Sequence, residues 1–117
     1  MTRIEGRFEI GNTKFEVVDF FKPNESFVEG TVMLKRAKEV GATLKYMTVQ
    51  RLLRNKHRIP EELKKFDIVL PGTVRCFGKN KVKVISYICN KGGSWVEGIG
   101  GVKYDWGERA RLLRVCN

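Results

Sequence analysis

The densest group of ionisable side chains lies in the stretch RLLRNKHRIP, residues 51–60. It contains no acid, and its ionisable residues are Arg51, Arg54, Lys56, His57 and Arg58. A surface made only for solubility mixes both signs of charge, so a stretch with cations alone indicates a polyanion nearby. His57 is the single histidine of the chain, and we expect it at the solvated surface because no neighbouring residue orients it. The stretch therefore predicts a phosphate-binding surface.

The positive charge is concentrated in part of the chain. The net charge is +10, yet residues 1–40 hold seven basic and seven acidic side chains. Residues 42–60 and residues 68–96 each hold five Lys or Arg and no acid. The second of these stretches places Lys79, Lys81 and Lys83 at alternate positions, and we predict that they also contact phosphate.

Aromatic residues follow among further cations late in the chain, where Trp95, Tyr104 and Trp106 alternate with Lys103, Arg109 and Arg111. Exposed rings at these positions would stack on unpaired bases while the cations hold phosphate. Buried rings would supply core area instead, and we expect this of at least one tryptophan.

The sequence has no motif for catalysis, a cofactor or a metal ion. Cys76, Cys89 and Cys116 form no C-x-x-C pair, so we expect three free thiols buried as small hydrophobes. Asp105 and Glu108 stand beside Arg109 and Arg111, and local ion pairing is the expected reason. We therefore predict a protein that is not an enzyme.

A glycine-rich segment at residues 98–101 has the composition of a phosphate loop. Such loops present amides at the start of a helix, whereas the residues that follow favour strand and turn. We expect a turn between two strands.

The first half of the chain predicts a β-hairpin and two helices. Strands at about 6–10 and 14–21 flank Gly11-Asn12, a pair typical of tight turns. Ser26 and Glu29 form a capping-box pattern for a helix over about 26–40, with Gly41 as its left-handed C-cap. A second helix is expected from Thr48 to Asn55, and a short helical turn after Pro60.

Residues 33–52 also permit a helix-turn-helix interpretation, because Ala37, Gly41 and Met47 have suitable spacing. Arg36 and Gln50 fall where buried apolar residues are needed. An ordinary helical hairpin packed on a sheet is the favoured interpretation.

From Phe66 onward, short apolar runs alternate with turn residues: FDIVL, TVRCF, KVKVISYIC, WVEGI and ARLLRVC. These predict a five-strand antiparallel meander or small barrel, with a bulge near Ser86. The expected fold is α+β in a single domain over residues 1–117, with hairpin and helices in 1–65 and strands in 66–117.

Three segments in the second half carry a resemblance: IPEELKKFDIVLPGT at 59–73, Trp95 and RLLRV at 111–115. The chain here resembles short bacterial and phage reading frames with an isoleucine-proline-acid start, a proline-glycine-threonine run, a tryptophan and an arginine-leucine ending. Leu70 stands where that pattern has phenylalanine. The resemblance implies a prokaryotic or phage setting and a strand-rich half, and no activity.

No apolar run approaches the ~20 residues of a membrane helix, and the N-terminus lacks an apolar signal region, so a cytoplasmic protein is expected. We predict a small basic module that binds nucleic acid, DNA or RNA, through phosphate. The alternative is a protein-interaction or structural accessory protein that binds an acidic partner.

Overall fold

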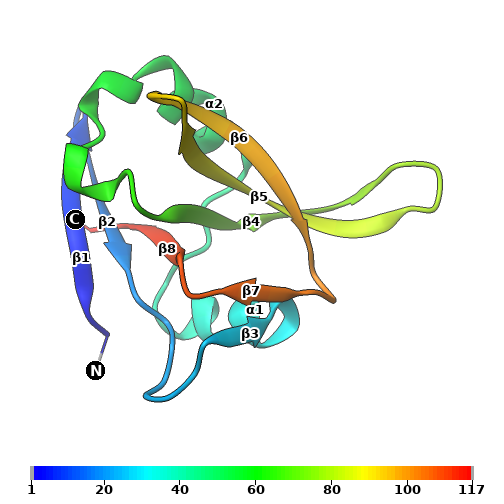
Figure 1. Ribbon diagram of the computed structural model, residues 1–117. Helices are drawn as coiled ribbons and strands as arrows, with labels where there is room; N and C mark the ends of the chain where they lie inside the picture. Colours follow the sequence, from blue (N-terminus) through cyan, green and yellow to red (C-terminus); the bar gives the residue numbers. More distant parts are fainter. Residues whose placement is uncertain (1, 117) are drawn as a thin grey trace.

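The computed structural model describes residues 2–116 and shows an α+β fold (Figure 1). Its helices are α1 (Gly30–Glu39) and α2 (Tyr46–Arg54), with single 3-10 turns η1 (Lys56–Arg58) and η2 (Glu61–Leu63). The strands are β1 (Ile4–Ile10), β2 (Thr13–Val18), β3 (Phe27–Glu29), β4 (Asp67–Phe77), β5 (Val82–Lys91), β6 (Ser94–Gly101), β7 (Asp105–Gly107) and β8 (Ala110–Val115).

Six of these strands form one mixed sheet in the order β1-β2-β8-β4-β5-β6. The C-terminal β8 lies between β2 and β4, antiparallel to the first and parallel to the second. The prediction of a five-strand antiparallel meander or a barrel is therefore wrong. Its local patterns indicated strands correctly, but they held no information on the return of β8 to the N-terminal hairpin. β3 and β7 form a separate two-stranded ribbon.

The central strands are buried on both faces, so their apolar residues are consecutive. Leu112 and Leu113 of β8 illustrate this, because Leu113 packs into one hydrophobic cluster and Leu112 into the other. Continuous apolar runs are typical of strands covered on both sides.

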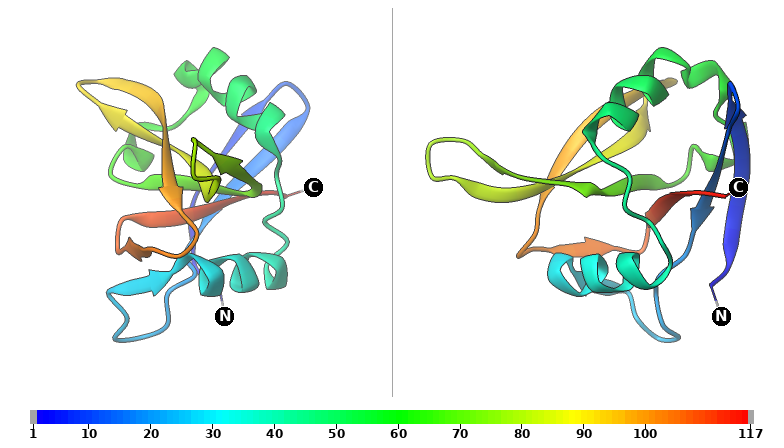
Figure 2. Two further views of the ribbon diagram at one scale, coloured as in Figure 1. Left: turned by 90° about the vertical axis from the view of Figure 1, so that its right-hand side faces the viewer. Right: turned by 180° about the vertical axis from the view of Figure 1, so that it is seen from behind.

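Each face of the sheet has its own cover. Val49 and Leu52 of α2 pack with Ile59 and Leu63 on one face, whereas α1 and the β3–β7 ribbon cover the other. The two views of Figure 2 place the helices at opposite ends of the molecule. Both interpretations of residues 33–52, the helix-turn-helix and the helical hairpin, are therefore wrong.

The N-terminal hairpin is confirmed, with Ile10 paired to Thr13 and Gly11 at a φ of 59°. The capping box is wrong, because Phe27–Glu29 pair with Asp105–Gly107 as a strand and the helix starts at Gly30. The predicted end of this helix, α1, is confirmed. Gly41 has a φ of 74°, and the amide of Ala42 donates to the Ala37 carbonyl, as in a Schellman motif. α2 starts at Tyr46 rather than Thr48.

The segments FDIVL and TVRCF, predicted as two strands, form the single strand β4. The pairing with β5 shifts between Leu70 and Arg75, so the irregularity expected near Ser86 lies in the facing strand. Thr73 is buried there, where its hydroxyl donates to the Leu70 carbonyl at 2.6 Å and accepts from the Ser86 amide at 2.8 Å.

The glycines at 98–101 belong to β6, so the predicted turn is wrong. A Cβ on Gly98 would lie 2.5 Å from the Tyr87 ring, and one on Gly100 would lie 2.6 Å from Trp106. The glycines are needed because these two rings, edge to face at 5.7 Å, lie directly on the strand.

Candidate nucleic-acid interface

The ends of β4 and β5 extend from the body of the molecule as a hairpin, residues 75–84, which we call the arm (Figures 1 and 2). Phe77 pairs with Val82, and residues 78–81 form the turn, with left-handed φ angles at Gly78 and Lys81. The arm exposes the three lysines of its own stretch that are predicted to contact phosphate: Lys79, Lys81 and Lys83.

A groove of about 490 Å³ lies beside the arm. Its lining residues come from α1, the arm and the β6–β7 turn: Thr31, Lys81, Val82, Lys83, Val102, Lys103 and Tyr104. We call this the arm groove. Three of these seven residues are lysines and none is acidic, so a negatively charged ligand is favoured there.

Tyr104 forms one wall of the arm groove and is 68% exposed. Its ring lies on Gly101, where any side chain would overlap the ring atoms. The backbone of Tyr104 is fixed, because its carbonyl accepts from the Gly30 amide at 3.0 Å and its amide donates to Gly101 at 3.3 Å. The ring therefore meets the strand along one edge, at Cδ2 and Cε2, and most of it is open to solvent.

Trp95 and Trp106 are not available for stacking, because they are only 5% and 7% exposed. Trp95 belongs to the cluster beneath α2, and the Trp106 indole donates to the Gly101 carbonyl at 3.1 Å. Of the three aromatic residues predicted as stacking platforms, only Tyr104 has the necessary exposure.

The basic stretch at 51–60 lies elsewhere. Arg54, Lys56 and Arg58 are exposed at the end of α2 and on η1, and we call them the helix-end patch. Lys56 Nζ donates to the Ser94 hydroxyl at 3.0 Å, which places the patch beside the β5–β6 turn. Figure 1 shows that this turn and the tip of the arm are on different sides of the molecule. His57 is also exposed.

Arg51 has a structural role, because its guanidinium is bonded within the protein. Its guanidinium donates to the Ile10 carbonyl at 2.7 Å and to the Thr13 hydroxyl at 2.9 Å. These bonds tie α2 to the β1–β2 turn. Arg51 belongs to the stretch predicted to bind phosphate, but its long side chain reaches the hairpin and its guanidinium is engaged there.

Two carboxylates bound the basic surface beyond Tyr104. Glu29 and Asp105 face each other across the β3–β7 ribbon, and both are exposed. Their negative charges repel phosphate, so phosphate is disfavoured on this side of the groove.

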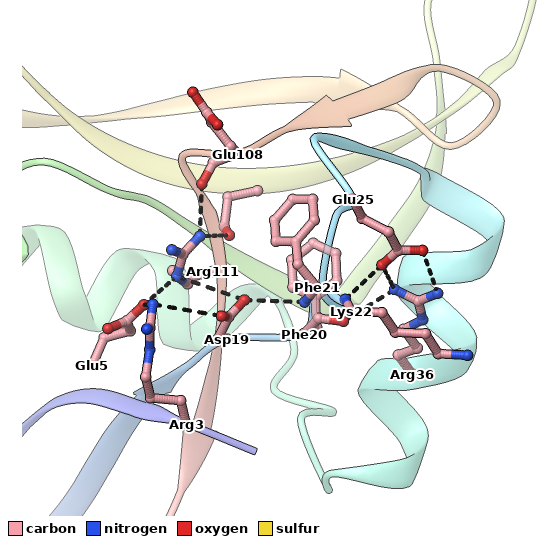
Figure 3. Close-up of polar contacts among 11 residues, drawn as sticks. Arg3, Glu5, Asp19, Phe20, Phe21, Lys22, Glu25, Arg36, Glu108 and Arg111 are labelled. Atoms are coloured by element: carbon pink, nitrogen blue, oxygen red, sulfur yellow. Dashed lines mark hydrogen bonds and ion pairs between the residues drawn. The ribbon is translucent and has the colours of Figure 1, made fainter. Parts of the chain in front are cut away.

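Apart from these basic surfaces, a polar cluster surrounds the loop at residues 19–25 (Figure 3). Arg111 is 8% exposed, and its Nε donates to Glu5 at 2.6 Å while the guanidinium lies over the Phe66 ring at 4.6 Å. Arg36 donates to both oxygens of Glu25, at 2.6 and 3.0 Å, and this lowers the pKa of Glu25 to about 2. The charges of this cluster are matched internally, so it stabilises the loop.

The predicted pairing of Arg109 and Arg111 with Asp105 and Glu108 is wrong. Arg111 pairs with Glu5 and takes only the backbone carbonyl of Glu108, while Arg109 lies 3.6 Å from Asp67. The partners lie across strands, because residues adjacent in a β-strand point to opposite faces.

A further polar network links β4, β5, β6 and α2. Glu97 accepts from the Tyr46 hydroxyl at 3.0 Å and from the buried Ser86 hydroxyl at 2.8 Å, and Arg75 donates to Ser86 at 2.9 Å. The bond to Glu97 raises the pKa of Tyr46. These side chains bond to one another, and the network joins the sheet to α2.

The three cysteines are unpaired, and only Cys89 is buried. Burial raises the pKa of its thiol. Cys76 is exposed on the arm opposite Lys83, contrary to the expectation that all three are buried. Over residues 2–116, no three His, Cys, Asp or Glu side chains are grouped to hold a metal ion.

Lys103 lines the arm groove but was not among the predicted phosphate contacts. The sequence shows that Lys103 precedes Tyr104, but only the fold of the β6–β7 turn brings it close to Lys81 and Lys83. Within the described chain, no helix is long and apolar enough to cross a membrane. No protein-family model, curated protein or solved structure matches the chain significantly.

Proposed function

We propose that this protein binds nucleic acid through its phosphates, with the arm groove as the principal contact. One observation supports this most strongly: Lys81, Lys83 and Lys103 line one groove together with an exposed tyrosine and no acid. Cations grouped on one surface attract a phosphate backbone and release its counterions, which makes the affinity depend on salt.

The helix-end patch supplies a second, separate contact in this proposal. Its three cations extend into solvent, but the neighbouring hollow also contains Glu61, which is paired with Lys64 at 2.7 Å. A nearby carboxylate reduces the attraction for phosphate. We therefore assign the larger share of binding to the arm.

An acidic protein is the rival partner, and the arm offers one reason. Phe77 and Val82 are 54% and 47% exposed on it, and apolar side chains of this kind are common at protein interfaces. These two apolar side chains do not distinguish the partners, but salt dependence and charge placement do.

Three variants with the same loss of charge test the proposal. The first changes Lys79, Lys81 and Lys83 to Gln in the arm, and the second changes Arg54, Lys56 and Arg58 to Gln. The control changes Lys14, Lys38 and Lys65 to Gln, which are exposed and belong neither to the arm groove nor to the helix-end patch. Affinity for labelled DNA and RNA, single-stranded and duplex, is measured against salt by fluorescence anisotropy.

We expect the arm variant to lose the most affinity and to reduce the salt slope by about 0.7–0.9 log unit for each lost phosphate contact. The helix-end variant should lose less, and the control should differ little from wild type. Equal losses of affinity in all three variants would mean that overall charge, and not the arm, determines binding. Failure of the wild-type protein to retain any nucleic acid at low salt would overturn the proposal, and capture of an acidic protein by the arm would then favour the rival.

A further inference from the structure

The exposed ring of Tyr104 bears on which form of nucleic acid would bind. In a duplex the base faces are covered by their neighbours, and only the phosphates and base edges are accessible. Flat aromatic surfaces on proteins stack on the bases of single strands, whatever their sequence. An exposed ring beside a cationic groove therefore has a use with unpaired bases that it lacks with an intact duplex.

The packing of the Tyr104 ring leaves most of it accessible. A Cβ on Gly101 would lie nearest to Cδ2 of the ring and successively farther from Cε2 and Cγ, so the ring meets the strand along this edge. The absence of a side chain at Gly101 permits the close approach. A ring held by one edge and 68% exposed can stack on a base.

The size of the arm groove agrees with a single nucleotide. A volume of about 490 Å³ is within the range of about 300–1,000 Å³ found for pockets that hold one small ligand. Lys81 and Lys83 on one wall and Lys103 beside the ring would then hold the phosphates on either side of one base.

We propose that the arm groove binds single-stranded nucleic acid, with one unpaired base stacked on Tyr104 and the adjoining phosphates held by Lys81, Lys83 and Lys103. This inference rests on the proposed function and adds the form of the ligand to it. DNA and RNA share the chemistry of a base face and a phosphate, and the experiment separates them.

The test compares four fluorescent probes of equal length: oligo(dT), oligo(U), an abasic DNA strand with the same phosphates, and a duplex. The protein variants are Tyr104→Ala and Tyr104→Phe. Phe27→Ala is the matched control, because Phe27 is 67% exposed on β3 and does not line the groove.

We expect wild type to bind at least one of the two base-bearing single strands more tightly than the abasic strand and the duplex. Tyr104→Ala should lose about 5-fold or more for that strand, within the range measured for base–aromatic stacking, and should change nothing for the abasic strand. Tyr104→Phe should retain wild-type affinity because it keeps the ring, and Phe27→Ala should behave as wild type. A preference for oligo(dT) or for oligo(U) then shows whether the ligand is DNA or RNA.

Exposure of Cys76 provides a second readout. Its thiol lies opposite Lys83, so bound oligonucleotide should slow its alkylation, as followed by peptide mass spectrometry. Equal affinity for all four probes, or an equal loss with the abasic strand in Tyr104→Ala, would overturn stacking and leave phosphate binding in place. Failure of every probe to bind would overturn both proposals.

Discussion

Glycine at position 100 illustrates how single residues position the larger elements. Trp106 lies against its Cα and is thereby kept in the cluster beneath α1. Replacing one Cα hydrogen of this glycine by a methyl group is sufficient to disturb the packing, since interiors of proteins are close-packed.

Gly100→Ala should destabilise the protein by about 1–3 kcal/mol, because its Cβ would lie 2.6 Å from the Trp106 ring and overpacking forces side chains or backbone to move. The free energy of unfolding in urea measures this. Gly107→Ala is the control, since the nearest atom to its Cβ is at 4.0 Å and belongs to Phe27. Equal stability of the two variants would contradict the packing argument.

Residue-scale interpretation of the sequence succeeded where the chemistry is local. Gly41 terminates α1, and the lysines of the arm are exposed as expected. It did not find the role of Arg51, because that role depends on partners distant along the chain. An arginine reaches a carbonyl 41 residues away as readily as it reaches solvent.

At the scale of elements, the irregular part of β4 determines where the arm begins. β4 pairs with β5 on both sides of residues 71–74, and Thr73 connects the two strands at this point. Proline has no amide hydrogen, so Pro71 is compatible with a strand at such a shift in pairing.

Thr73→Val should destabilise the protein by about 1–3 kcal/mol, because it leaves the Ser86 amide and the Leu70 carbonyl without the Thr73 hydroxyl. Valine keeps the shape of threonine, so the loss reports the hydrogen bonds. Thermal unfolding measures it. Thr43→Val, at an exposed position, should stay within about 0.5 kcal/mol of wild type, and a similar result for Thr73→Val would show that other groups satisfy the strand.

At the scale of the whole molecule, carboxylates paired with arginines hold the N-terminal hairpin and the loop at 19–25 to the rest. Glu16 is 5% exposed and accepts from Arg7 at 2.7 Å and Arg114 at 2.9 Å. Hydrogen bonds from the arginines lower the pKa of Glu16, and the bond to Arg36 lowers the pKa of Glu25 to about 2.

These carboxylates predict how stability depends on pH. A carboxyl whose pKa is lower when folded contributes stability above its ordinary pKa of 4.5, and this contribution is lost as the pH falls toward the folded value. The melting temperature should therefore decrease between about pH 4.5 and 2. Glu25→Gln should flatten this decrease, whereas Glu62→Gln, an equal charge change at an exposed site, should retain it. Identical pH profiles for wild type and Glu25→Gln would contradict the assigned pairing.

The sequence by itself determined the class of fold, the β1–β2 turn, the end of α1 and the two stretches of unopposed positive charge. These depend on contacts between neighbours in the chain, such as a left-handed glycine or a run of apolar residues. Only the tertiary structure decided that β8 enters the sheet between β2 and β4, and that Lys103 and Tyr104 meet Lys81 across a groove. The reason is that strand order and side-chain clustering arise from pairing between distant segments, and periodicity along a strand specifies a buried face without specifying its neighbour.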